Sequence, residues 1–95
     1  MDSPRAELKW LVDAVGILDE DAGPDWHLGA LVRISWGIVD GRWSEAEQPD
    51  LFAELREVLR RSKAWYVSWP MMMEWLRSYR AKWPDGYWWW YPEAL

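Results

Sequence analysis

Five consecutive aromatic residues, Tyr87 to Tyr91, place the strongest constraint on how this chain folds. In a β-strand, successive side chains point to opposite faces, so Trp88 and Trp90 face one way and the other three rings face the other. A helix spreads the five rings around most of its circumference. We therefore expect one set of rings to close the protein's own core. The other set must be covered by another part of the chain, by a partner or by water.

The same difficulty extends to the whole aromatic content, which is 11 Trp, 4 Tyr and 1 Phe in 95 residues. Surface scaling gives a chain of this size roughly 10,700 Å² to bury on folding. Sixteen aromatic side chains supply about 3,200 Å² of that area, so a single small domain spanning residues 1–95 can accommodate them. Each buried indole N–H also needs an acceptor, and we expect several tryptophans to be half exposed.

Proline and glycine divide the chain into four segments and a tail. Ser3-Pro4 is typical of a helix start, because serine caps the first N–H groups and proline fits the first helical position. Gly23-Pro24 is expected to end this helix. Its apolar residues follow the 3.6-residue period and are Leu8, Leu11, Val12, Val15 and Leu18.

The second segment, residues 25–41, fits two structures. Its length and the Pro24-Asp25 start favour a helix. Its β-branched residues and two interior glycines weaken the helix, and the alternation of Val32, Ile34, Trp36 and Ile38 with the residues between them fits a strand, with Asp40-Gly41 as a hairpin turn. As a helix, its expected buried stripe is Leu28, Leu31, Val32, Trp36 and Val39.

The third and fourth segments are predicted helices that begin at Pro49-Asp50 and at Ser68-Trp69-Pro70. Their expected buried residues are Leu51, Phe52, Leu55, Val58 and Leu59 in the third helix, which ends near residues 62–64, and Met72, Trp75, Leu76, Tyr79 and Trp83 in the fourth. The predicted fold is therefore all-α: a compact bundle of four short helices with an aromatic C-terminal segment packed across it. The alternative is an α+β fold with strands near 30–39, 64–68 and 87–91.

Charge is unevenly distributed along the chain, whose net charge is −5. Residues 1–54 hold 12 acidic and 4 basic side chains, whereas residues 55–95 hold 4 acidic and 7 basic ones. Two interpretations are open: the halves pair with each other in the fold, which we favour, or they form differently charged faces. The acidic total argues against direct binding of nucleic acid.

Catalytic and metal-binding patterns are weak. The chain has no Cys and a single His, His27, and no nucleophile elbow accompanies its serines. Residues 19–25 are acidic but lack the alternating oxygen ligands of a calcium loop. We therefore expect a protein that is not an enzyme and has no metal or cofactor.

The N-terminal residues 1–7 lack the basic-then-apolar pattern of a signal peptide. The longest apolar stretch, residues 28–39, is interrupted by Arg33 and is too short to cross a bilayer. We expect a cytoplasmic protein with no membrane contact.

These features together predict a small, acidic protein-binding module that docks on a basic partner through an aromatic patch with an acidic rim. An inhibitor, immunity protein or antitoxin is its most concrete form. The alternatives are a module that binds carbohydrate or another ring-stacking ligand, and a structural subunit that associates as a homodimer. The expected partner-binding residues are Trp83, Tyr87, Trp88, Trp89, Trp90, Tyr91, Asp19, Glu20, Asp21 and Asp25.

Overall fold

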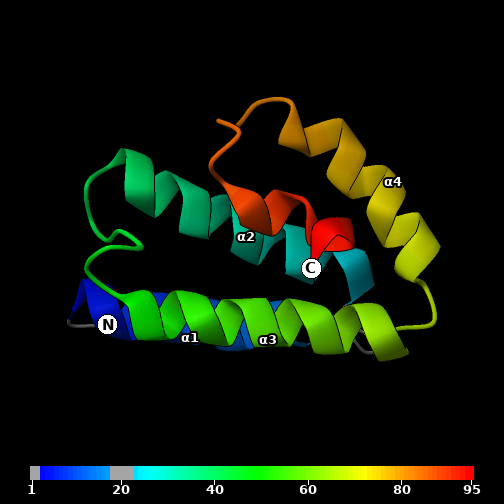
Figure 1. Cartoon of the computed structure of the whole chain (residues 1–95), viewed down its shortest axis with the longest axis horizontal. Coiled ribbons are helices and arrows are strands. Elements are labelled where there is room, and N and C mark those ends of the chain that lie inside the picture. Colours follow the sequence, from blue (N-terminus) through cyan, green and yellow to red (C-terminus); the bar gives the residue numbers. More distant parts are fainter. Residues whose placement is uncertain (1–2, 18–22) are drawn as a thin grey trace.

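Four α-helices and an aromatic C-terminal segment make up the fold (Figure 1). The computed structural model describes residues 3–17 and 23–95. The elements are α1 (Pro4–Val15), α2 (Gly23–Val39), α3 (Pro49–Trp65), α4 (Trp69–Arg80) and two short 3₁₀ helices, Trp88–Trp90 and Pro92–Ala94. Within these described residues no strand forms. The all-α prediction is confirmed, and the strands considered near 30–39, 64–68 and 87–91 do not exist.

The helices surround one apolar core. α1 packs against both α2 and α3, and α4 packs against α2. The C-terminal segment, orange to red in Figure 1, lies across α2 and contacts α3. It closes the side of the bundle that the helices alone leave open.

α1 begins as expected but ends earlier. The Ser3 hydroxyl accepts the Ala6 N–H at 3.0 Å, which caps the first turn. The helix ends at Val15, whereas the sequence indicated an end at Gly23-Pro24. Gly16 follows directly, and glycine is a poor helix former. Gly23 instead begins α2. The predicted core position Leu18 lies outside the described residues.

α2 is a helix, but its buried stripe differs from the predicted one. Leu28 and Leu31 are buried as expected, whereas Trp36 and Val39 are exposed. Buried in their place are Ile34 and the polar residues His27 and Ser35. The prediction was wrong because it assigned the core side by hydrophobicity alone. The polar side chains face inwards, where they form hydrogen bonds to α1 and to the C-terminal segment.

The Asp40-Gly41 turn ends α2 and does not form a hairpin. Gly41 has a φ of +75°, its N–H donates to Ile38 O at 3.1 Å, and the Arg42 N–H donates to Gly37 O at 2.8 Å. This pair of bonds is a Schellman motif, which needs a left-handed residue that glycine adopts without strain. The turn folds Trp43 back onto the last turns of α2, where its indole N–H donates to Ile34 O at 2.9 Å.

α3 and α4 begin where the sequence predicts, but α4 ends at Arg80, before the predicted position Trp83. Both begin with proline in the first turn. The predicted stripe of α3 packs into the core, with Val58 half-buried. In α4, Met72 and Leu76 are buried as expected, whereas Trp75 and Tyr79 are exposed, because Met73 takes a core position in their place.

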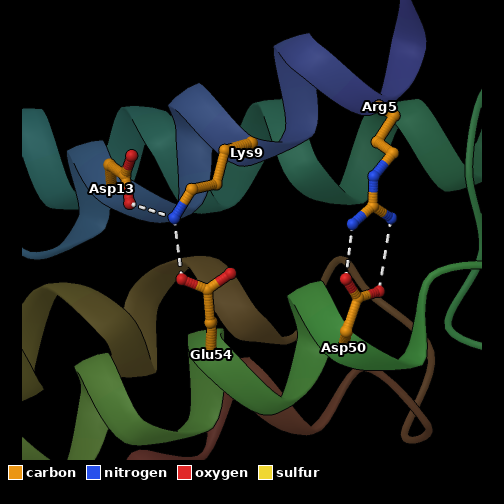
Figure 2. A network of polar contacts seen from close by, with 5 residues as sticks. All are labelled: Arg5, Lys9, Asp13, Asp50 and Glu54. Carbon is orange, nitrogen blue, oxygen red and sulfur yellow. Dashed lines mark hydrogen bonds and ion pairs between the residues drawn. The ribbon is translucent and has the colours of Figure 1, made fainter.

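Ion pairs hold α1 against α3 on the outer side of the bundle (Figure 2). Arg5 forms a forked contact with Asp50, and Lys9 Nζ lies 2.7 Å from Glu54 and 3.2 Å from Asp13. Through these bonds Arg5 lowers the pKa of Asp50, and Glu54 followed by Asp13 raises the pKa of Lys9. All of these side chains are exposed, so the network orients the two helices and responds to salt.

The ion pairs of the described residues do not join the two differently charged halves. Among the described residues, every ion pair joins two members of the same half: residues 1–54 pair internally, and so do residues 55–95. The described ion pairs therefore do not support the favoured interpretation of the charge asymmetry, and the acidic residues 19–21 lie outside the described residues. Several basic side chains of the second half instead hold the C-terminal segment.

Candidate functional site

The C-terminal aromatic segment lies largely inside the protein. Trp89 and Trp90 are 2% and 0% exposed, and Tyr87, Trp88 and Tyr91 are half-buried against the core. Trp83 stacks on Trp90 with ring centroids 6.0 Å apart and planes 10° apart. It also stacks on Tyr87 at 5.9 Å. The structure thus brings the six predicted aromatic residues together, with the two most buried facing inwards.

The hydroxyl of Ser35 explains how two adjacent indoles are buried. The Trp89 and Trp90 Nε1–H groups both donate to Ser35 Oγ at 2.9 Å. The same hydroxyl donates to Leu31 O at 2.9 Å. A serine hydroxyl has one donor and two acceptor positions, so this arrangement uses its full capacity. Both buried N–H groups are satisfied by one side chain of α2.

The outer rings of the segment are held by charged side chains. Trp88 donates to Glu45 Oε1 at 3.0 Å, and the Arg56 guanidinium lies 4.4 Å from the centre of its ring. Arg80 lies 4.5 Å from the centre of the Tyr91 ring and pairs with Glu93 at 2.7 Å. Lys63 donates to Pro92 O and to Leu95 O. These contacts occupy the outward side of the segment, and only parts of its rings remain open to a partner.

Three exposed tryptophans lie elsewhere, on α1 and α2. Trp10, Trp26 and Trp36 are 45%, 43% and 53% exposed. Trp10 and Trp26 meet edge to face with centroids 6.1 Å apart, and the Arg33 guanidinium lies 5.8 Å from the centre of the Trp10 ring. We call Trp10, Trp26, Arg33 and Trp36 the indole face.

The indole face adjoins the predicted site. Trp36 contacts Trp83 edge to face at 5.4 Å, and Trp83 in turn stacks on Tyr87. The ring contacts therefore form two groups, Trp10 with Trp26 and Trp36 with Trp83 and Tyr87. The exposed part of the predicted patch belongs to the second group.

A hollow of about 150 Å³ opens beside the Trp10–Trp26 pair, and both indoles line it. Gly29 leaves it open, since a Cβ built at this position meets no atom within 4 Å. Its lining residues are Trp10, Leu11, Asp25, Trp26, Gly29, Ala30 and Arg33.

Charge near the indole face is mixed. Glu7, which is mostly buried, pairs with Arg42 and lies 3.5 Å from Arg33. Asp25 is exposed in the first turn of α2, where the helix dipole favours a carboxylate. The other predicted acidic residues, Asp19, Glu20 and Asp21, lie outside the described residues.

His27 is buried and neutral. Its Nδ1–H donates to Val15 O at 3.1 Å, and its Nε2 is buried without a hydrogen-bond partner among the described residues. Burial lowers the pKa of His27 to about 4, against the smaller opposite effect of the Val15 hydrogen bond. The ring lies edge-on to Trp69 and caps the last carbonyl of α1. It acts as a tertiary link between α1, α2 and α4.

The described residues lack the patterns of a metal site and of a membrane span. Within residues 3–17 and 23–95, no group of three His, Asp or Glu side chains is placed to hold a metal ion. None of the helices in the described part of the chain has the length and apolar character needed to cross a membrane. No protein-family model, curated protein or solved structure matches the chain.

Sequence reasoning missed the indole face although a signal for it was present. Trp10 and Trp26 lie off the apolar stripes of their own helices, so a helical wheel places both towards solvent. Trp36 was assigned to the core because Ser35 was not recognised as the inward-facing residue.

Proposed function

We propose that this chain is a non-enzymatic protein-binding module whose docking surface is the indole face, continued by the exposed parts of Trp83 and Tyr87. The observation that carries this proposal is the exposure of three tryptophans on the neighbouring helices α1 and α2, in a fold that satisfies its buried indoles internally. Trp43, Trp89 and Trp90 each donate to an acceptor inside the protein. The three rings of the indole face remain nearly half open to solvent.

The exposed area is large enough to act as an interface centre. Three indoles of up to about 250 Å² each, nearly half exposed, offer roughly 350 Å² of ring surface. Patches of this size on small proteins are often functional. Tryptophan and arginine are also the residues most enriched among those that carry binding energy. Truncating one such anchor typically costs an interface about 2–4 kcal/mol.

The proposed partner is a positively charged protein. The chain carries a net charge of −5, which accelerates association with a basic partner at low salt. The most concrete role for this chain is that of an inhibitor, which neutralises a basic protein as an immunity protein or antitoxin does. The charges then mainly set the association rate, and the indoles set the lifetime of the complex.

Affinity capture from the source cell with paired variants tests this proposal. Trp26→Ala combined with Trp36→Ala removes two anchors of the indole face. Trp65→Ala combined with Trp75→Ala removes two exposed indoles on α3 and α4 and serves as the control. We expect the wild type and the control to retain the same protein, and the indole-face variant to lose it. Equal recovery with both double variants, or no recovered protein with any of them, contradicts the proposal.

A further inference from the structure

We infer that the indole face binds an extended, proline-containing segment, and that the hollow above Gly29 takes one of its proline rings. This inference rests on the proposed function, because it specifies which part of a protein partner the surface recognises. Four features of the face support it: the shape of the hollow, its charges, the spacing of the indoles and the available area.

The hollow has the shape of a pocket for one compact ring. The indoles of Trp10 and Trp26 meet at 70° and form part of its wall, and Gly29 contributes no side chain to fill it. Its volume of about 150 Å³ leaves room for a single small side chain. Aromatic-lined grooves of this kind are the usual docking sites of polyproline II segments, whose rings lie against indole faces.

The charges around the hollow select an uncharged occupant. The Arg33 guanidinium already lies over the Trp10 ring, so an incoming lysine or arginine meets a like charge there. The carboxylate of Asp25 lines the same hollow and disfavours an incoming acidic side chain. Proline satisfies both conditions, because its ring is neutral and its backbone is already ordered before binding.

The spacing of the indoles matches an extended segment. Trp26 and Trp36 are ten residues apart on α2, which corresponds to about 15 Å along the helix axis and a rotation of about 80° around it, so a segment that contacts both crosses the helix obliquely. Five residues of a polyproline II helix span about the same length, at roughly 3.1 Å per residue. Arg33 lies between the two indoles in the sequence, and its guanidinium carries only donors. The backbone carbonyls of a polyproline II segment are free to accept them.

The area of the face favours a short segment over a second copy of this chain. A stable contact between globular surfaces buries about 800 Å² on each partner, more than twice the roughly 350 Å² of exposed indole. An extended segment needs less area, since it loses little conformational freedom on binding.

Calorimetric titration of the full chain with a capped decaproline peptide tests the inference. A capped Gly-Ser peptide of equal length is the control ligand, because it is also uncharged but flexible. We expect saturable binding of decaproline at or below about 1 mM and no binding of the control peptide. Absence of decaproline binding up to that concentration overturns the inference.

Two variants and one spectroscopic measurement locate the binding. Gly29→Leu fills the hollow while favouring the helix, and we expect it to bind decaproline at least about tenfold more weakly without melting at a lower temperature. Trp65→Ala, on α3, should bind as the wild type does. Independently of either variant, decaproline should shift the indole N–H resonances of Trp10 and Trp26 and leave those of Trp89 and Trp90 in place. Unchanged affinity in Gly29→Leu, or shifts confined to other indoles, contradicts the inference.

The outcomes separate this inference from the proposed function. If the captured protein still depends on Trp26 and Trp36 while decaproline does not bind, the docking surface stands and the proline specificity fails. Binding of a linear oligosaccharide such as cellohexaose to the same indoles, in place of decaproline, also overturns the inference and identifies a sugar-stacking site.

Discussion

Replacing Gly37 with alanine places a methyl group inside the ring system of Trp43. A Cβ built at Gly37 lies 2.0 Å from Trp43 Cζ2 and 2.1 Å from Cε2, far below contact distance. The indole cannot easily retreat, because it is buried in the core and its Nε1 is bonded to Ile34 O. The substitution therefore forces either a shift of α2 or expulsion of the ring.

The expected loss of unfolding free energy follows from these two outcomes, a shifted α2 or an expelled Trp43 ring. Overpacking a tight core typically costs about 1–3 kcal/mol, and losing a buried tryptophan about 3–5 kcal/mol. Alanine returns up to about 1 kcal/mol through its higher helix propensity. We expect Gly37→Ala to lower the free energy of unfolding by about 3 kcal/mol, which lowers the Tm by roughly 12–24 °C in a domain of this size.

Gly29→Ala is the matched control, because Gly29 lies in the interior of the same helix with no atom within 4 Å of its built Cβ. It should stabilise the protein by about 0.5–1 kcal/mol. Urea unfolding of the wild type and both variants, followed by intrinsic fluorescence, measures the three stabilities. If Gly37→Ala is as stable as Gly29→Ala, the indole of Trp43 does not pack against Gly37 in the folded protein.

Three further predictions concern polar groups. Ser35→Ala leaves two buried indole N–H groups without an acceptor and should cost about 3 kcal/mol in urea unfolding, whereas Ser62→Ala, which removes only a bond to Val58 O, should cost about 1 kcal/mol or less. Equal costs would refute the role of Ser35. His27 has a folded-state pKa of about 4, below the 6.5 of the unfolded chain, so the unfolded chain takes up the proton first as the pH falls. Stability should therefore decrease between pH 6.5 and pH 4 by about 3 kcal/mol more in the wild type than in His27→Gln, and parallel pH profiles of the two proteins argue against a buried neutral histidine. Asp50→Asn should lower the Tm at low ionic strength and have little effect in about 1 M salt, where the Debye length is about 3 Å. A loss of Tm that is independent of salt would show that Asp50 acts by something other than its ion pair with Arg5.

The sequence predicted the helices that local rules define. α3 and α4 begin at proline residues, and their apolar residues recur at helical spacing, so both helices were predicted at nearly their observed positions. The preference for a helix over a strand in residues 25–41 was also right. These predictions needed only neighbouring residues, which is why they succeeded.

The core side of α2 required information from far along the chain. Ser35 faces inwards because it is the acceptor for indoles 54 and 55 residues later. No periodicity within α2 indicates such a partner. The same applies to Gly37, whose missing side chain makes room for Trp43 only after the turn at Gly41 has reversed the chain.

The candidate site was also predicted only as far as neighbouring residues determine it. The steric argument that contiguous rings face more than one way was sound, but the helices and the charged side chains of residues 55–95 cover most of them. Ser35 accepts hydrogen bonds from two of these rings, and the basic side chains of Arg56, Lys63 and Arg80 contact the rest of the segment. The indoles of Trp10, Trp26 and Trp36, on the outer sides of α1 and α2, are among those that remain exposed.

Site-resolved exposure of the indoles to a soluble paramagnetic agent, measured by NMR on the free protein, tests this assignment most directly. The resonances of Trp10, Trp26 and Trp36 should broaden strongly, and those of Trp43, Trp89 and Trp90 should stay sharp. Strong broadening of Trp89 and Trp90, with Trp10 and Trp26 protected, would contradict the indole face as the docking surface and return that role to the C-terminal segment.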